Sequence, residues 1–126
     1  MLPASLFSAT TYYLGLTKKF FFFTNAGSGP AYFFALVEHL TASATALGLS
    51  PEQATRLAKQ TCLGAGRMLA ESAEAPAQLR RNVTSPKGTT EAALQSFEAS
   101  GFAAIVDKAV KAATDRAGEL GKTLGG

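Results

Sequence analysis

Residues 50–72 read SPEQATRLAKQTCLGAGRMLAES, and this stretch establishes the fold class of the chain. It opens with Ser50 as a helix N-cap, Pro51 at the first helical position and Gln53 three residues after the cap, which predicts a capping box. Residues of the expected inward face then recur at spacings of three and four, the period of a helix face. They are Ala54, Leu57, Ala58, Thr61, Ala65, Met68 and Leu69. The pattern predicts a helix that ends near Ser72.

The flanking segments carry similar helix boundaries. Upstream, Ser28 or Gly29 lies near a predicted cap, Pro30 lies in the first turn, and Gly48 ends the helix. Downstream, helices are predicted over 76–82, 89–100 and 102–120. Apolar residues mark the inward face of three of these helices. In the upstream helix they are Phe33, Val37, Leu40, Ala44 and Leu47. In 89–100 they are Ala93, Leu94 and Phe97, and in 102–120 they are Ile105, Val106, Ala109, Val110, Ala113 and Ala117. The sequence therefore predicts an all-α bundle of about five helices that needs no strand.

Several of these helices carry mainly Ala and Gly on their inward faces. Cys62 is interpreted as a small buried side chain, and Gly64 and Gly66 as sites of close helix packing. Small side chains bury little area, so a single chain of 126 residues would have a thin core. An intimate dimer would remedy this, and we expect one on physical grounds alone.

Composition excludes several classes of function. The 12 basic and 9 acidic residues give a net charge of only +3 without a basic stripe, so no nucleic-acid partner is expected. The single Cys62 excludes an intrachain disulfide and a Cys-rich zinc site, and the single His39, interpreted as a boundary residue, leaves no histidine pair for a metal. No metal site is predicted, and the composition suits a cytoplasmic location.

Residues 1–25 form an apolar leader that differs from the rest of the chain. Lys18 and Lys19 follow the apolar stretch instead of preceding it, which is not the arrangement of a signal peptide, and 2–16 is too short to span a membrane. No membrane role is expected, although Phe20–Phe23 with the two lysines keeps membrane association open as a weaker alternative. Phe20–Phe23 could instead form a short strand. We expect a helical domain over 26–121 and a disordered tail over 122–126.

Two glycine pairs resemble the start of a dinucleotide-binding fingerprint. Gly27-Ser28-Gly29 is followed by Pro30 and lacks a third glycine, and the second pair, Gly64 and Gly66, lies inside a helical pattern. A dinucleotide turn needs a preceding strand and a βαβ unit of roughly 30 residues. The sequence therefore predicts no dinucleotide fold in this chain.

The loop 84–90 allows two interpretations. Three kinds of feature meet there just before a helix: hydroxyl side chains, Pro86 and Gly88. The simpler interpretation is a capped helix start with Ser85 or Thr89 as the cap. The alternative is an anion site, because the free N–H groups and the dipole at a helix N-terminus suit a carboxylate or phosphate.

Two segments together resemble a known family. Residues 26–34, AGSGPAYFF, and residues 83–90, VTSPKGTT, are similar to the Ser-Gly-Ser-Gly-Pro-Ala-Tyr and Thr-Ser-Pro-Gly-Gly-Thr-Thr stretches of pyrroline-5-carboxylate reductases. Residues 46–50, ALGLS, and 60–65, QTCLGA, also look like that family, as does the spacing of Phe97, Gly101 and Phe102. The resemblance covers roughly residues 26–121.

The resemblance implies a fold and an activity. The family reduces 1-pyrroline-5-carboxylate to L-proline with NADPH or NADH, using an N-terminal dinucleotide domain and a C-terminal helical domain. This chain resembles the C-terminal domain, an intertwined dimer as in 6-phosphogluconate-dehydrogenase-like reductases. The resemblance thus implies a homodimer, which could assemble further, and a small-molecule substrate.

The resemblance also assigns site residues. Thr90 would be the catalytic residue and would hydrogen-bond the ring nitrogen. Ser28 and Gly29 would lie near the nicotinamide. The substrate would be bound by Pro30, Val83, Ser85, Gly88, Thr89 and Thr90: Pro30 and Val83 as apolar walls, the others around the substrate carboxylate.

The chain departs from the family pattern at two positions. Ala26 stands in place of the first Ser, which removes a hydroxyl near the cofactor. Lys87 stands in place of a Gly; if this position needs a positive φ, Lys there costs about 1 kcal/mol or more, and otherwise it could add a cation beside the carboxylate. A non-catalytic helical module that modifies assembly of a full-length reductase is the alternative function.

Overall fold

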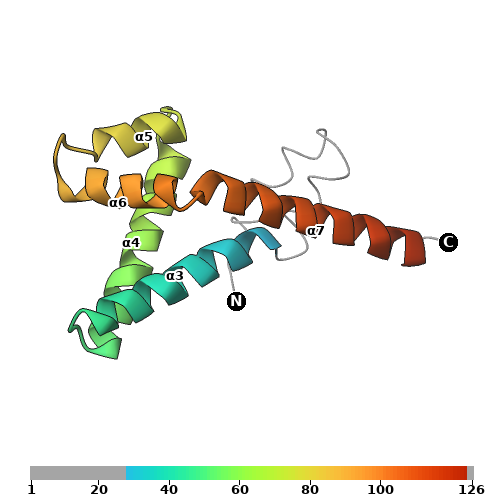
Figure 1. The fold of residues 1–126 in the computed structure, drawn as a ribbon, viewed down its shortest axis with the longest axis horizontal. Coiled ribbons are helices and arrows are strands. Elements are labelled where there is room, and N and C mark those ends of the chain that lie inside the picture. Colours follow the sequence, from blue (N-terminus) through green and yellow to red (C-terminus); the bar gives the residue numbers. More distant parts are fainter. Residues whose placement is uncertain (1–27, 125–126) are drawn as a thin grey trace. The chain divides into compact units, whose positions relative to one another are not determined.

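The computed structural model describes residues 28–124, and in this part of the chain all regular structure is α-helical. Helix α3 spans Ser28–Ala46, α4 spans Pro51–Glu71, α5 spans Pro76–Asn82, α6 spans Thr89–Ala99 and α7 spans Phe102–Leu124. The five helices, without a strand among the described residues, confirm the predicted all-α class (Figure 1).

The chain divides into two compact units. One unit comprises residues 33–103 and holds most of α3 together with α4, α5 and α6. Of the described residues, the other unit contains 28–32 and most of α7. The divisions fall inside α3 and α7.

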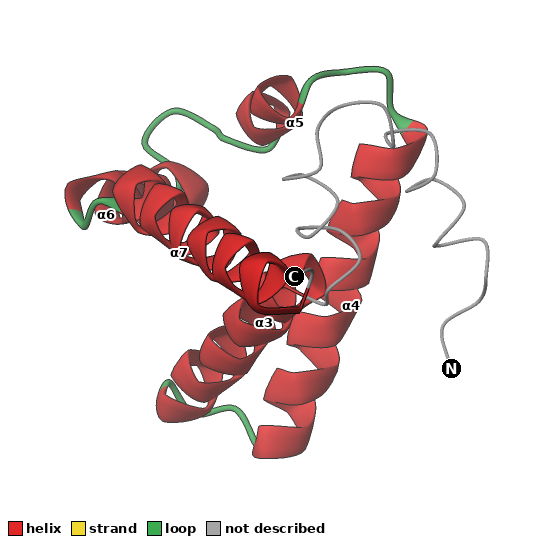
Figure 2. Ribbon diagram, turned by 90° about the vertical axis from the view of Figure 1, so that its right-hand side faces the viewer, coloured by secondary structure: helices red, strands yellow, loops and turns green. Residues whose placement is uncertain are grey.

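Helices α3 and α4 are joined by a tight turn at residues 47–50. Gly48 adopts φ +114°, which L-residues other than glycine rarely adopt, and this glycine ends α3 as predicted. The predicted capping box is confirmed: the Gln53 N–H donates to the Ser50 hydroxyl at 3.2 Å, and the Ser50 N–H donates to the Gln53 side chain at 3.2 Å. The two helices leave this turn in different directions (Figure 1), and Figure 2 shows the connecting turn from the side.

The predicted bounds of α5 are confirmed, and those of α6 are within one residue. Gly101, at φ +78°, lies in the turn between α6 and α7. Across this turn the rings of Phe97 and Phe102 stack with their centroids 5.0 Å apart, which closes the turn with an apolar contact.

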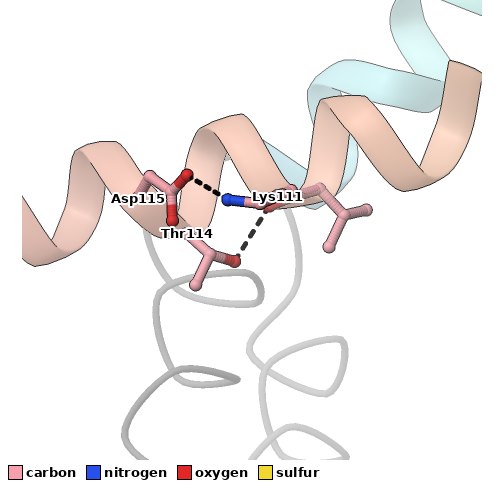
Figure 3. Close-up of polar contacts among 4 residues, drawn as sticks. Lys111, Thr114 and Asp115 are labelled. Atoms are coloured by element: carbon pink, nitrogen blue, oxygen red, sulfur yellow. Dashed lines mark hydrogen bonds and ion pairs between the residues drawn. The ribbon is translucent and has the colours of Figure 1, made fainter.

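Helix α7 extends further than the sequence suggested. It continues to Leu124, so the predicted end near Leu120 was too early and residues 122–124 of the predicted disordered tail are helical. Lys111 donates to Asp115 at 2.7 Å, and the Thr114 hydroxyl donates to the Val110 carbonyl at 2.8 Å (Figure 3).

Asp115 stabilises the charged form of the Lys111 side chain. The hydrogen bond to Asp115 and the negative charge of Asp115 raise the pKa of Lys111 above its ordinary value. Desolvation opposes this rise, and the charge of Asp107 adds a smaller rise. A raised pKa means that the pairing is complete at neutral pH and is lost only as the pH rises through that pKa in strongly alkaline solution. Both side chains are exposed, so this pair contributes little to stability.

Very little apolar surface is buried within one chain. Among the described residues, Ala54 and Ala58 are the buried hydrophobic side chains. The large hydrophobic residues that remain exposed are Phe33, Phe34, Leu36, Leu40, Leu47, Leu49, Leu57, Leu63, Met68, Leu69, Val83, Phe97, Phe102, Ile105, Val106 and Leu120. Much of the face of α4 that the sequence predicted to be inward is therefore not covered in one chain.

Two predictions about small residues were wrong for a single chain. Cys62 is half-buried, not buried, because few side chains of this chain cover its side of α4. A Cβ atom placed on Gly64 or Gly66 would meet nothing within 4 Å, so neither glycine packs against another described part of this chain. His39, predicted to be a boundary residue, is exposed in one chain.

The predicted leader 1–25, including the strand suggested for Phe20–Phe23, lies outside the described residues. None of the described helices is long and apolar enough to cross a membrane. Residues 28–124 also contain no cluster of three His, Cys, Asp or Glu side chains that could hold a metal ion.

Candidate functional site

The loop 83–88 follows a short helix that polar side chains hold in place. Asn82 at the end of α5 donates to Glu74 at 2.9 Å and accepts from Gln78 at 2.8 Å. Gln78 in turn accepts from Arg81 at 2.7 Å. This chain of contacts runs from a carboxylate to a guanidinium, so both of its ends carry charge-assisted hydrogen bonds. It fixes the last turn of α5, from which the loop starts.

Thr84 ties the first part of the loop back to this helix. Its hydroxyl donates to the Arg80 carbonyl at 2.6 Å, and its N–H donates to the Arg81 carbonyl at 3.0 Å. These bonds satisfy carbonyls that the end of α5 would otherwise leave without partners. The loop therefore leaves the helix in a defined direction.

Residues 85–88 form a tight turn. The Gly88 N–H donates to the Ser85 carbonyl at 3.1 Å, with Pro86 and Lys87 as the two central residues. Lys87 adopts φ +59°, the left-handed conformation that the third residue of a type II turn requires and that glycine normally supplies. The conditional prediction for this position is thereby resolved: it does need a positive φ, and Lys87 bears the strain.

Gly88 lies against the turn that precedes it. A Cβ atom at this position would come within 3.1 Å of the Ser85 carbonyl oxygen, closer than most real contacts. The turn thus has room for glycine alone without a shift. The Gly88 N–H is already engaged within the turn, so it is not a free donor for a ligand.

Helix α6 starts without a side-chain cap. Its N-cap is Gly88, so the interpretation with Ser85 or Thr89 as the cap was wrong. The reason is that the turn hydrogen bond brings Gly88 into the cap position, one residue before Thr89. The N–H groups of Thr89 and Thr90 lie in the first helical turn, where no preceding carbonyl can accept from them.

Glu91 is a residue that the sequence analysis missed. Its carboxylate accepts a hydrogen bond from the Lys87 N–H at 2.7 Å, reaching back from the first turn of α6 past the cap. A signal was present, because Glu three residues after an N-cap is the second half of a capping box. Glycine at the cap conceals that signal, since the first half requires Ser or Thr.

Three hydroxyl groups of the loop and of the start of α6 make no hydrogen bond among the described residues. Among the described residues, those of Ser85, Thr89 and Thr90 have no hydrogen-bond partner, unlike that of Thr84. Thr90 is half-buried, whereas Ser85 and Thr89 are exposed. Val83, at the start of the loop, is 57% exposed, which leaves its isopropyl group available as an apolar wall. Five of the predicted site residues thus lie within eight consecutive positions.

The remaining predicted residues lie at the start of α3. Ser28 is half-buried, Gly29 is buried and Pro30 is exposed. Pro30 lies in the first turn of α3, as predicted. These three residues belong to the unit that includes α7, whereas the loop 83–90 belongs to the unit 33–103. Each group forms a local arrangement of its own. Gly64 and Gly66 lie inside α4, which confirms that they are not part of a dinucleotide turn.

A sequence profile of the family described as pyrroline-5-carboxylate reductase dimerisation matches residues 21–120 of this chain. The chain belongs to this family. The family match encompasses both candidate segments, the start of α3 and the loop 83–90.

Bacterial pyrroline-5-carboxylate reductases are similar to this chain in sequence. The pyrroline-5-carboxylate reductase of Pseudomonas aeruginosa is 55% identical over 100 residues, which cover 79% of this chain and 37% of that protein. Pyrroline-5-carboxylate reductase 1 of Bacillus spizizenii is 43% identical over 95 residues, covering 75% of this chain and 32% of that protein. The chain thus spans about a third of the length of these relatives.

Solved reductases share the fold. The pyrroline-5-carboxylate reductase of Coxiella burnetii aligns with a TM-score of 0.75 at 45% identity, over 81% of this chain and 37% of that one. The pyrroline carboxylate reductase of Plasmodium falciparum, solved with NADP bound, aligns with a TM-score of 0.71 at 35% identity, over 75% of this chain and 38% of that one. The helical arrangement is therefore that of the reductases' dimerisation region.

Proposed function

We propose that this chain is the dimerisation and substrate-binding part of a pyrroline-5-carboxylate reductase, which reduces 1-pyrroline-5-carboxylate to L-proline. The observation that carries this proposal is the loop 83–90, where two helix-start N–H groups and three unpaired hydroxyls lie together. Family membership supplies the reaction class, and the loop supplies groups suited to a small imino acid.

The substrate carboxylate would bind at the start of α6. The N–H groups of Thr89 and Thr90 are donors without helical acceptors, and the Ser85 hydroxyl can add a third. The helix dipole favours an anion there by about 0.3–1 kcal/mol. Since the Gly88 N–H is engaged in the turn, Gly88 would contribute through the close approach that its missing side chain permits.

Thr90 would orient the ring, and apolar side chains would contact it. The Thr90 hydroxyl, half-buried and unpaired, can hydrogen-bond the ring nitrogen and so direct the C=N bond for hydride transfer to the ring carbon. Val83 and Pro30 offer exposed apolar surface for the pyrroline ring. In this proposal Thr90 would contact the reacting group, and Val83 would keep water from the ring.

NADPH or NADH would be the hydride donor, as the reductase relatives suggest. The described residues do not fit a whole dinucleotide, because residues 28–124 hold no strand and therefore no strand–glycine-turn–helix unit. Ser28 and Gly29 can contribute at most one hydroxyl and two backbone N–H groups at the start of α3, an edge of such a site.

The proposed assembly is a homodimer. The many exposed apolar side chains on α3, α4, α6 and α7 would be covered by a second copy, in keeping with the dimerisation family. The domain boundary at 25/26 and a cytoplasmic location are part of the same proposal, and such a dimer could assemble further.

Binding of L-proline to variants of Thr90 tests the site. Thr90→Val removes the hydroxyl while preserving the shape and backbone N–H, and we expect about tenfold weaker binding, the loss of roughly one hydrogen bond. Thr90→Ser should restore most of the affinity. Isothermal titration calorimetry measures both, with Thr55→Val as a control on α4, where the hydroxyl only donates to the Pro51 carbonyl.

The two outcomes are distinct. Weaker binding in Thr90→Val alone would support the assigned role. Equal affinity of the Thr90→Val and wild-type proteins for L-proline would remove Thr90 from the site.

A further inference from the structure

We infer that Glu91 is a positioning residue of the substrate loop: its carboxylate holds Lys87 in the left-handed conformation that orients the Thr89 and Thr90 N–H groups. The inference rests on the proposed function for its consequence in binding. Its structural part, a contact between Glu91 and Lys87, stands on the geometry of the loop alone.

The first observation is the strain at Lys87. Its φ of +59° lies in the region where the Cβ of an L-residue crowds the following carbonyl, and it is the sole described non-glycine residue with a positive φ. Such a conformation persists when surrounding interactions determine it. The turn bond from Gly88 to Ser85 closes the turn, but it does not involve the N–H or side chain of Lys87.

The second observation is the bond that does involve Lys87. Its N–H donates to the Glu91 carboxylate at 2.7 Å, a short, charge-assisted hydrogen bond. Rotation of Lys87 away from positive φ would reorient the peptide units on either side of it and draw this N–H off the carboxylate. Glu91 therefore favours the strained conformer over its competitors.

The third observation concerns where this restraint acts. Lys87 precedes the Gly88 cap, and Thr89 and Thr90 follow the cap directly. Because Glu91 lies in the same helical turn as the two threonines, its contact joins the turn and the helix start into one closed ring of residues 87–91. The direction of the two N–H groups that would receive a carboxylate is thus fixed before any ligand arrives.

A glycine at position 87 would not need this restraint, since glycine adopts positive φ without steric cost. The effect of Glu91 should therefore depend on the residue at position 87, which a double-mutant cycle measures. Any direct effect of the Lys87 ammonium on binding cancels in the cycle.

Amide NMR of the full chain tests the contact without a ligand. On acidification through the range in which carboxylates protonate, the Lys87 amide proton should shift by the largest amount in the loop. Glu91→Gln should abolish that titration, and the control Glu98→Gln, on the same helix with its carboxylate unpaired, should preserve it. A Lys87 amide that titrates equally in wild type and Glu91→Gln would overturn the inference.

L-proline binding tests the consequence. We expect Glu91→Ala to weaken binding about five- to tenfold, Glu91→Gln to recover part of it, and Glu91→Ala in the Lys87→Gly background to change it by less than about twofold. Thr89 and Thr90 amide shifts should move with Glu91→Ala only when Lys87 is present. Equal effects in both backgrounds would show that Glu91 acts through charge or helix stability and would refute positioning.

The outcomes separate the inference from the proposed function. In one outcome, the wild-type chain binds no L-proline but shows the Lys87 titration and the background-dependent amide shifts. This result would refute the proposed function and leave the Glu91 contact established. Normal L-proline binding without that titration would support the proposed function and refute the Glu91 contact. Unchanged far-UV circular dichroism in each variant excludes unfolding as the cause.

Discussion

At the scale of single residues, Lys87 is where sequence and backbone disagree most. A long charged side chain occupies a turn position with φ +59°, while the next residue, Gly88, has no room for a Cβ beside Ser85. Position 88 thus carries glycine, the residue type that its geometry favours, whereas position 87 carries a lysine where the geometry favours glycine. The strain at Lys87 is offset by local contacts, among which the Glu91 carboxylate is the charged one.

Lys87→Gly should stabilise the folded chain. Removing the left-handed strain is worth about 1 kcal/mol in the free energy of unfolding, less what the more flexible unfolded chain regains. Urea denaturation at matched protein concentration measures this difference. The control Lys59→Gly places glycine in the exposed interior of α4 and should destabilise by about 1 kcal/mol. Destabilisation by both substitutions would contradict the strain at position 87.

Glu91 shows why single residues can escape sequence analysis. The capping pattern at Ser50 was recognisable because both of its partners were of the expected types, and the structure confirmed it. At Gly88 the cap residue has no side chain, and Glu91 reaches one residue further back than a standard box. Only the turn geometry at 85–88 brings the Lys87 N–H within its reach.

At the scale of elements, helix boundaries depend on local chemistry. The start of α4 combines the Ser50 cap, Pro51 and Gln53, three features that need no tertiary contact. The start of α6 has none of these features and depends on the preceding turn. The two helices therefore differ in how much of their stability is encoded locally.

Ser50→Ala should destabilise the chain by about 1 kcal/mol, because the Gln53 N–H loses its acceptor. Denaturant unfolding followed by circular dichroism measures the change. Ser96→Ala, inside α6 and exposed, makes no such bond and should change stability by less than about 0.5 kcal/mol. A Ser50→Ala protein as stable as wild type would show that the capping box adds nothing in solution.

At the scale of the whole molecule, the dominant feature is apolar surface that one chain does not cover. On α4, residues at spacings of four, three and four form one exposed face: Leu57, Thr61, Gly64 and Met68. Leu57 is 56% and Met68 50% exposed, although both were predicted to be inward. We call these four residues the α4 outer face, and the proposed dimer would cover it.

Leu57→Glu should shift the chain from dimer toward monomer, because a charge placed in a buried apolar contact is costly. Analytical ultracentrifugation over a concentration series measures the mass. Lys59→Glu, on the opposite side of the same helix, is the control and should preserve the dimer. A wild-type chain that sediments as a monomer at all concentrations would rule out the proposed assembly.

Gly64→Ala separates packing within one chain from packing between two. In one chain the added methyl group meets nothing within 4 Å and should stabilise α4 by up to about 1 kcal/mol. Against a second copy in close approach it should instead weaken dimerisation. Gly66→Ala, on the other side of α4, should raise stability without affecting the dimer. An identical response of the two variants in sedimentation would argue against Gly64 at an interface.

The sequence by itself determined the helical class, most helix boundaries and the family, because caps, proline and glycine positions and apolar spacing act over a few neighbouring residues. It also anticipated that one chain would have a thin core. Tertiary structure decided which faces are covered, and the backbone conformation of the turn 85–88 decided the Glu91–Lys87 contact and the identity of the α6 cap. These features depend on which groups the folded backbone brings together, and periodicity along the chain does not encode that.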